Sequence, residues 1–182
     1  SFEDILASVG DGQFTDSDFP PSDSSLIANW DNSDIGDPLR KEFQWIRASE
    51  IGCLKDSDGN QKIFEGKIEP NDIKQGQLGD CYFLSTLSVL TEHPERIMKL
   101  FATDQVNPQG VYGINMCKNG EYQTVIVDDH IPCNSGNDAG PCFSKGNGPE
   151  LWVILLEKAW AKIHGSYERV IGGQAHLAMR DL

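Results

Sequence analysis

The chain has 182 residues, with 15 Lys and Arg against 28 Asp and Glu, and therefore carries a formal net charge of −13. Such an excess of acidic groups opposes binding to nucleic acid or to an anionic membrane surface, because both partners gain affinity from clustered basic side chains. The sequence contains no run of about 18 apolar residues, so we expect a soluble protein without a membrane span.

The cysteines are spread along the chain without a CxxC pair or a regular spacing: Cys53, Cys81, Cys117, Cys133 and Cys142. An odd number with this spacing is unlike a secreted disulfide framework or a zinc site. We therefore expect free thiols in a cytoplasmic protein, with a Cys133–Cys142 bridge only in an oxidising compartment. Ser1 opens the chain without the features of a signal peptide, which indicates a piece of a longer protein.

Residues 1–60 hold 13 acidic and 4 basic side chains and are rich in Asp, Ser, Gly and Pro. This composition favours turns and extended chain. We expect an irregular N-terminal segment that wraps residues 61–182, the body of the same domain. Large apolar side chains usually act as anchors in such a segment. The expected anchors are Phe19, Leu26, Trp30, Phe43, Trp45 and Ile46.

An almost continuously apolar run over residues 81–91 predicts a helix buried in the core. Asp80 stands at its start, where aspartate is a favoured N-cap. Pro94 marks the end of this helix, and residues 95–101 predict a second, shorter one.

Two β-prone runs, residues 111–117 and 122–127, flank an Asn-Gly pair, which is the strongest short signal for a β-hairpin. Residues 151–164 repeat apolar side chains at helical spacing, with Glu157, Lys158 and Lys162 on the other side. This pattern predicts an amphipathic helix closed by Gly165. Helices combined with a hairpin predict the α+β class.

Cys81 lies where chemistry can occur, because it falls in the first turn of the predicted buried helix. The partial positive charge of a helix start favours the thiolate over the thiol. The free Cys81 amide can donate to a developing oxyanion, and Gln75 offers a second, neutral donor. Gly76 and Gly79 allow the backbone to approach a substrate closely. The alternative is that Cys81 is simply a small buried apolar residue.

Residues 75–84, Gln-Gly-Gln-Leu-Gly-Asp-Cys-Tyr-Phe-Leu, resemble the nucleophile motif of the calpain family of papain-like, calcium-dependent cysteine proteases. Four further stretches resemble family motifs in the family's order: residues 19–26, 45–51, 125–132 and 150–168. The resemblance implies a papain-like subdomain in which Cys81 is the nucleophile and Gln75 the side chain of the oxyanion hole. Tyr82 stands where the family more often has Trp.

A thiolate protease also needs an imidazole and a third group that orients it. The family carries this His and Asn on a second catalytic subdomain, which we expect beyond Leu182. None of the histidines of this chain stands at the matching position, and we expect surface or structural roles for His93, His130, His164 and His176. The chain alone is therefore expected to be inactive or nearly so.

A calcium site is the second functional candidate, because calcium prefers several oxygen ligands from carboxylates and loop carbonyls. The resemblance implies that the ligands are the carbonyls of Phe64 and Gly66 and the side chains of Asp72 and Glu150. The alternative is a structural role, in which Asp72 caps a turn and Glu150 complements a helix dipole.

Two functions remain open from the sequence. The first is the nucleophile-bearing part of an intracellular, calcium-regulated cysteine endopeptidase that cleaves protein substrates through a Cys81 thioester, with the second catalytic subdomain of the same polypeptide as its partner. The alternative is a calcium-responsive, non-catalytic binding module of calpain type. Retention of both Gln75 and Cys81 favours the enzyme.

Overall fold

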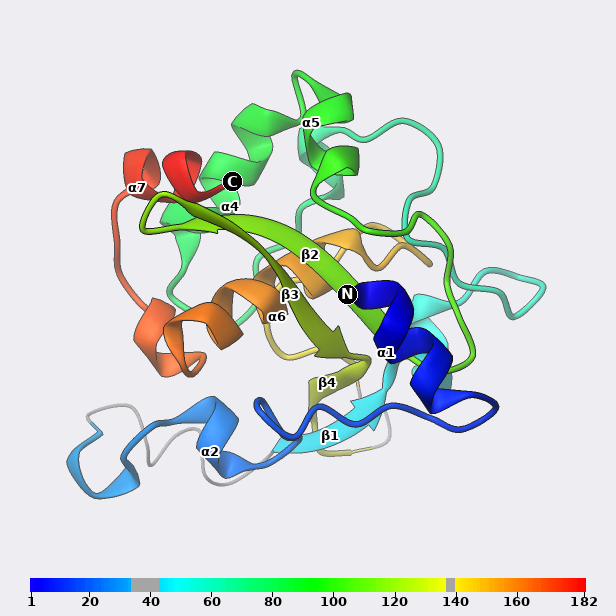
Figure 1. The fold of residues 1–182 in the computed structure, drawn as a ribbon. Coiled ribbons are helices and arrows are strands. Elements are labelled where there is room, and N and C mark those ends of the chain that lie inside the picture. Colours follow the sequence, from blue (N-terminus) through cyan, green and yellow to red (C-terminus); the bar gives the residue numbers. More distant parts are fainter. Residues whose placement is uncertain (34–42, 137–139) are drawn as a thin grey trace.

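The computed structural model describes residues 1–33, 43–136 and 140–182 and mixes helices with small antiparallel sheets (Figure 1). This confirms the predicted α+β class. The helices are α1 (Phe2–Val9), α2 (Asp23–Leu26), α4 (Cys81–Leu90), α5 (Pro94–Lys99), α6 (Trp152–His164) and α7 (Ala175–Asp181). The strands are β1 (Phe43–Arg47), β2 (Val111–Lys118), β3 (Glu121–Asp128) and β4 (His130–Asn134). None of the helices in these ranges has the length and apolar character needed to cross a bilayer.

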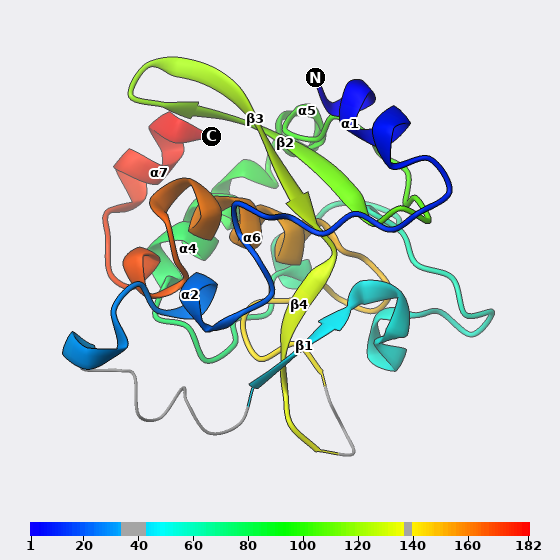
Figure 2. The same ribbon diagram turned by 60° about the horizontal axis from the view of Figure 1, so that its bottom comes forward.

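The predicted hairpin is confirmed as the pair β2 and β3, in register from Val111 opposite Asp128 to Lys118 opposite Glu121. Its two-residue turn has φ of 54° at Asn119 and 83° at Gly120, the backbone geometry that favours Asn-Gly in tight hairpins. The chain then continues past β3 into β4, which pairs with β1 in a second antiparallel sheet (Figure 2). The sequence did not predict this second sheet.

Helix α6 runs beneath the hairpin and forms the centre of the core (Figures 1 and 2). Every side chain from Trp152 to Ala161 is buried. The predicted polar side of this helix is wrong for two residues, since Glu157 is 2% exposed and Lys158 0%. Both are buried because they have partners inside the core, which the periodicity of the sequence does not reveal. The predicted closure at Gly165 is found, with φ of 101°.

Helix α4 begins at Cys81, as predicted, but it is not buried on all sides. Phe83 and Leu87 are fully buried, whereas Val89 is 59% exposed. Cys81 and Ser85 are exposed as well. Residues four apart share one face of a helix, so Cys81, Ser85 and Val89 form an exposed stripe along α4.

Within residues 1–60 the structure has a helix, α1, that the sequence did not predict; the Ser1 side chain caps it. Of the expected anchors, Phe19 and Leu26 lie in the core, and the others pack against it from partly buried positions: Trp30, Phe43, Trp45 and Ile46. A hydrogen bond also attaches the segment to the body, since the Asp16 amide donates to the Asp128 carboxylate (Oδ2) at 2.8 Å.

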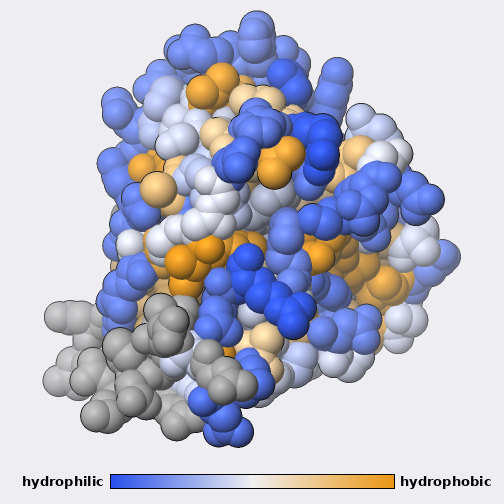
Figure 3. Space-filling model, turned by 90° about the vertical axis from the view of Figure 1, so that its left-hand side faces the viewer, coloured by the Kyte–Doolittle hydropathy of each residue, from blue (hydrophilic) through white to orange (hydrophobic). Residues whose placement is uncertain are grey.

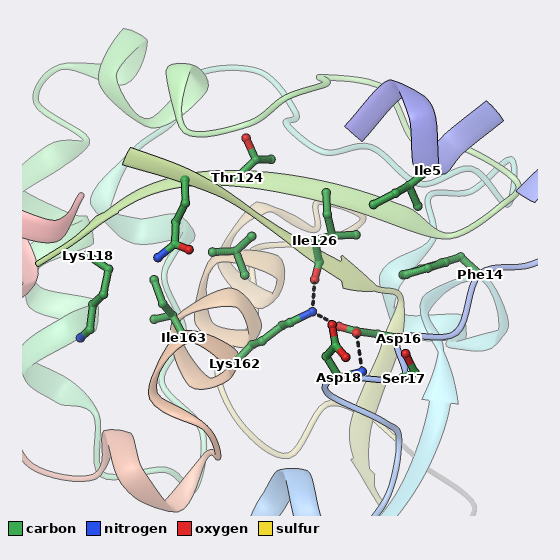
Figure 4. A pocket seen from close by; sticks show the side chains of 12 residues that line it. Ile5, Phe14, Asp16, Ser17, Asp18, Lys118, Thr124, Ile126, Lys162 and Ile163 are labelled. Atoms are coloured by element: carbon green, nitrogen blue, oxygen red, sulfur yellow. Dashed lines mark hydrogen bonds and ion pairs between the residues drawn. The ribbon is translucent and has the colours of Figure 1, made fainter. Parts of the chain in front are cut away.

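A cavity of about 630 Å³ lies between this segment, β3 and α6 (Figure 4). Apolar side chains, including Phe14 and Ile163, line part of it. Lys162 Nζ reaches across to Asp16 Oδ2 and to the carbonyl of Ile126, both at 2.7 Å. The cavity therefore lies at the boundary between the N-terminal segment and the body of the domain. Cys81 is not among its lining residues, so it is separate from the candidate nucleophile.

Candidate active site

Cys81 is the first residue of α4, and its thiol is free and exposed. The carbonyl of Asp80 accepts the amides of Phe83 and Leu84, at 2.8 and 3.2 Å. The Cys81 amide has no acceptor within the described residues, as expected at a helix start. The structure therefore places an accessible thiol next to an unused backbone donor.

The loop before Cys81 is fastened to residues 142–145. Lys74 and Lys145 exchange two backbone hydrogen bonds of 2.9 Å, and the Gln77 amide donates to the Cys142 carbonyl at 2.9 Å. A Cβ at Gly76 would lie 2.0 Å from the Phe143 carbonyl oxygen. Only glycine allows this approach, so Gly76 fixes the course of the loop that leads to the nucleophile.

Gln75 is exposed on this loop, and its Nε2 donates to the Leu78 carbonyl at 3.1 Å. A side-chain amide nitrogen carries two N–H groups. One N–H of Gln75 holds the side chain on the loop before Cys81, while the second has no acceptor among the described residues.

Gly172 and Gly173 lie beside the nucleophile turn, which the sequence analysis missed. The Gly172 amide donates to the Gly79 carbonyl at 2.9 Å. A Cβ at Gly173 would lie 2.5 Å from the Tyr82 ring, whose hydroxyl accepts from Trp160 Nε1 at 3.1 Å. The signal in the sequence was the Gly-Gly pair, which offers bare backbone where another chain can approach closely.

A recess of about 200 Å³ opens at this place and includes Tyr82, Trp160 and the two glycines in its lining. Figure 3 shows the face that carries α7, where hydrophobic surface lies in a hollow between hydrophilic side chains. Phe83 stacks on Trp160 with ring centroids 4.9 Å apart. The aromatic contacts thus join α4, α6 and the glycine pair.

The four histidines lie in different parts of the fold. His93 is exposed near Glu95, and His176 is exposed on α7. His130 Nδ1 lies 3.1 Å from an oxygen of Asp128. His164 contacts the Trp160 carbonyl and Lys118 Nζ, at 2.8 and 2.7 Å. Within the described chain, none of them has a hydrogen bond to the Cys81 thiol.

The candidate calcium ligands lie around a buried carboxylate. Glu150 is 1% exposed, and its two oxygens accept the amides of Asn147 and Glu65, at 3.1 and 3.4 Å. Burial raises the pKa of Glu150, and the negative charge of Asp72 acts in the same direction. The pair therefore concentrates negative charge without a cation among its partners in the described residues.

The contacts of the candidate ligands agree only in part with the roles expected from the sequence. Asp72 caps its own turn, since its Oδ2 accepts the Glu69 amide at 2.7 Å, which agrees with the structural role named as the alternative. Glu150 precedes the N-cap of α6 and makes no helix-capping bond. Gly66 has φ of 66° in an exposed loop that also contains Phe64. The described residues contain no cluster of three or more metal-binding side chains, so a cation here needs backbone carbonyls. Two carboxylates and an irregular loop fit the donor chemistry of calcium.

Cys133 and Cys142 are free and buried in the structure. Burial raises the pKa of Cys133 to about 12. Burial likewise raises the pKa of Cys142, whose Sγ donates to the Pro132 carbonyl at 3.1 Å. Both thiols are therefore chemically quiet, in contrast to the exposed Cys81.

Residues 14–182 match the family described as calpain family cysteine protease. The chain is 42% identical over 181 residues to the calpain-type cysteine protease DEK1 of Arabidopsis thaliana and 41% identical over 180 residues to ADL1 of Oryza sativa subsp. japonica. It is 34% identical over 178 residues to calpain-10 of Mus musculus. These alignments cover 99%, 98% and 93% of the chain, but only 8%, 8% and 25% of the relatives.

A free thiol at an exposed helix start, on a loop shaped by glycine, is an arrangement typical of proteins that use a cysteine nucleophile. The family match specifies this class further. The chain belongs to the calpain family of cysteine proteases and corresponds to part of its catalytic region.

Proposed function

We propose that this chain is the nucleophile-bearing part of an intracellular, calcium-regulated cysteine endopeptidase that cleaves protein substrates. The observation that carries the proposal is the exposed Cys81 thiol at the start of α4, beside a free amide. The odd number of cysteines, without a CxxC pair or a regular spacing, supports free thiols in a reducing compartment such as the cytoplasm.

In the proposed reaction the Cys81 thiolate attacks the carbonyl carbon of the scissile peptide bond and forms a C–S bond. The carbonyl oxygen becomes an oxyanion, to which the Cys81 amide and Gln75 Nε2 donate. When the intermediate collapses, the C–N bond breaks and the leaving amine takes a proton from an imidazolium group. Water then hydrolyses the thioester.

The imidazolium and the group that orients it come, in this proposal, from a second catalytic subdomain of the same polypeptide. The contacts of His93, His130 and His164 support this assignment, because each of these three is directed to other groups. The open space beside Gly172, whose amide donates to Gly79, supports close approach of an extended substrate near this turn.

The test compares peptide cleavage by the two-subdomain protein with cleavage by this chain alone. We expect cleavage only by the longer protein, only with calcium, and not after Cys81→Ala. Cys53→Ala is the matched control, since that thiol is also exposed but belongs to no site. Activity that survives Cys81→Ala would exclude the proposed nucleophile. Absence of all activity in the longer protein would favour the non-catalytic binding module.

Calcium is proposed to bind at the side chains of Asp72 and Glu150 and the carbonyls of Phe64 and Gly66. When bound, it supplies positive charge between two carboxylates that otherwise repel. Residues 64–72 lead directly into the loop of Gln75, so the carboxylates would hold that loop in one arrangement relative to α6.

Glu150→Gln is expected to weaken calcium binding to this chain by at least tenfold, because one anionic ligand becomes a neutral one. Isothermal titration calorimetry measures the affinity directly. Asp58→Asn is the control, since Asp58 lies exposed in a turn outside the proposed site and its loss should leave the affinity unchanged. Equal weakening by both variants would reduce the effect to general charge and remove the site.

A further inference from the structure

Asp80, the residue before Cys81, has an unusual environment. Its side chain is 0% exposed. It stands at the N-cap of α4, but its carboxylate makes no capping hydrogen bond, which corrects the role expected from the sequence. Neither of its oxygens meets an N–H or O–H donor of the described residues. An ionised carboxylate buried without a donor is costly, so this group requires another explanation.

The group that Asp80 does contact is a second acid. Glu157 of α6 is 2% exposed, and its carboxyl lies within hydrogen-bonding reach of Asp80. The Glu157 oxygens also accept the Ser144 amide, at 3.1 and 3.3 Å. Two carboxylates in contact inside a protein cannot both stay ionised, whereas one carboxylic acid can donate to one carboxylate.

No cation relieves this pair among the described residues. Lys158, the next residue on α6, is directed to Asp128 and to the His130 carbonyl. The titratable side chains that face the two acids are Tyr82 from α4, Cys142 from the loop before α6, and Tyr167 from the turn after α6. All three are neutral near pH 7, because burial raises the pKa of each. The environment therefore favours the protonated form of one acid.

Burial acts on both acids in the same direction. Burial holds the pKa of Glu157 well above its usual range, and the Asp80 charge acts in the same direction. Burial also raises the pKa of Asp80. A carboxyl group whose pKa is higher in the folded than in the unfolded state keeps a proton that unfolding releases.

We propose that Asp80 and Glu157 share one proton, and that the hydrogen bond it makes ties the Cys81 turn to α6. Both are positioning residues, because neither reaches the reacting atoms. Loss of the proton would break this tie and place a second negative charge behind the thiol. The positioning role rests on the proposed function of Cys81, but the shared proton itself can be measured without catalysis.

Infrared spectroscopy of this chain detects a protonated carboxyl group through its C=O stretch. We expect this band at pH 7 in the parent chain and its loss in Glu157→Gln and in Asp80→Asn. Each amide can donate to the remaining carboxylate and so preserves the tie without the proton. Glu92→Gln is the matched control, since Glu92 is exposed, and it should keep the band. A parent chain without the band at pH 7 would overturn the proposal.

The unfolding equilibrium gives an independent measurement. The folded pair holds about one proton more than the same two groups of the unfolded chain at pH above about 5. Between pH 5 and pH 7, the unfolding constant of the parent chain should therefore rise tenfold per pH unit relative to that of Glu157→Gln. Asp80→Asn provides the same comparison should Glu157→Gln not fold. Parallel pH profiles of parent and variants would contradict a shared proton.

Alkylation of Cys81 tests the tie separately. Asp80→Asn should keep the alkylation rate within about twofold, whereas Asp80→Ala, which cannot bridge to Glu157, should change it several-fold. Equal rates in all three proteins, with the infrared band present, would refute positioning but leave the shared proton. A parent Cys81 that does not react would instead count against the proposed nucleophile, while the infrared result would still decide the proton.

Discussion

Lys158→Met should lower the free energy of unfolding by about 3–5 kcal/mol, the range for removing one partner of a buried ion pair. Lys158 is 0% exposed, and its Nζ donates to Asp128 and to the His130 carbonyl. Methionine fills a similar volume, so the loss comes from leaving the Asp128 carboxylate uncompensated. Denaturant unfolding of the chain measures the change, and Lys99→Met, at an exposed position on α5, should change stability by less than about 0.5 kcal/mol.

The pH dependence provides a second check on this ion pair. Burial acts against ionisation, but His130 and Lys158 together hold the pKa of Asp128 below its usual range. A carboxylate with a lowered folded pKa stabilises the protein above about pH 4, and this stability is lost as the pH falls further. The difference between Lys158→Met and the parent chain should therefore shrink in acid. A constant difference down to pH 2 would mean that the lost stability is packing rather than charge.

Gly76→Ala should destabilise the chain by about 3 kcal/mol, near the upper end for overpacking. The new Cβ would lie 2.0 Å from the Phe143 carbonyl oxygen, and a backbone group cannot rotate away as a side chain can. Relief requires the loop to leave residues 142–145, which breaks the bond from Gln77 to Cys142. Because this loop carries Gln75, the proposed oxyanion donor, we also expect loss of peptidase activity in the two-subdomain protein.

Gly52→Ala is the matched control for the loop substitution. A Cβ at Gly52 meets no atom within 4 Å, and its φ is not in the left-handed region. Thermal unfolding should separate the two variants clearly. Equal stability of Gly76→Ala and Gly52→Ala would show that the contact with Phe143 yields easily and that the loop is not fixed by it.

Local signals were sufficient for the parts of the fold that depend on neighbouring residues. The Asn-Gly turn gave the hairpin, and the helical spacing after Leu151 gave α6, since both patterns act within a few residues. The sheet of β1 and β4 was not predicted, because it pairs residues 43–47 with residues 130–134, and two five-residue strands so far apart carry no local pairing signal.

The polar residues of α6 show why the buried charges were missed. Periodicity identifies Glu157 and Lys158 as polar and so places them on the surface. Their partners, Asp80 and Asp128, lie 77 and 30 residues earlier in the chain, and no spacing rule connects such positions. Asp128 and Asp129 are each part of a buried ion pair, the former with Lys158 and the latter with Arg47 at 2.5 Å.

The residues of the candidate site also fall into those that local sequence indicates and those that only the fold brings together. Cys81 and Gln75 could be predicted as candidates, because the helix start and the glycines before it lie within a few consecutive residues. Gly172 and Gly173 come beside Cys81 only through the fold, by the bond from Gly172 to Gly79. The pairing of Asp72 with Glu150 came from the family resemblance rather than from any local pattern.

The exposed stripe of α4 has a consequence for the chemistry of the thiol. Cys81, Ser85 and Val89 lie on an exposed face of α4, which no other described residues cover. A thiol that a peptide can reach is equally open to peroxide, and thiolate character favours both reactions. Oxidation to sulfenic acid would silence the nucleophile reversibly, whereas further oxidation would do so permanently. Covering by a second subdomain would thus protect the sulfur as well as complete the site.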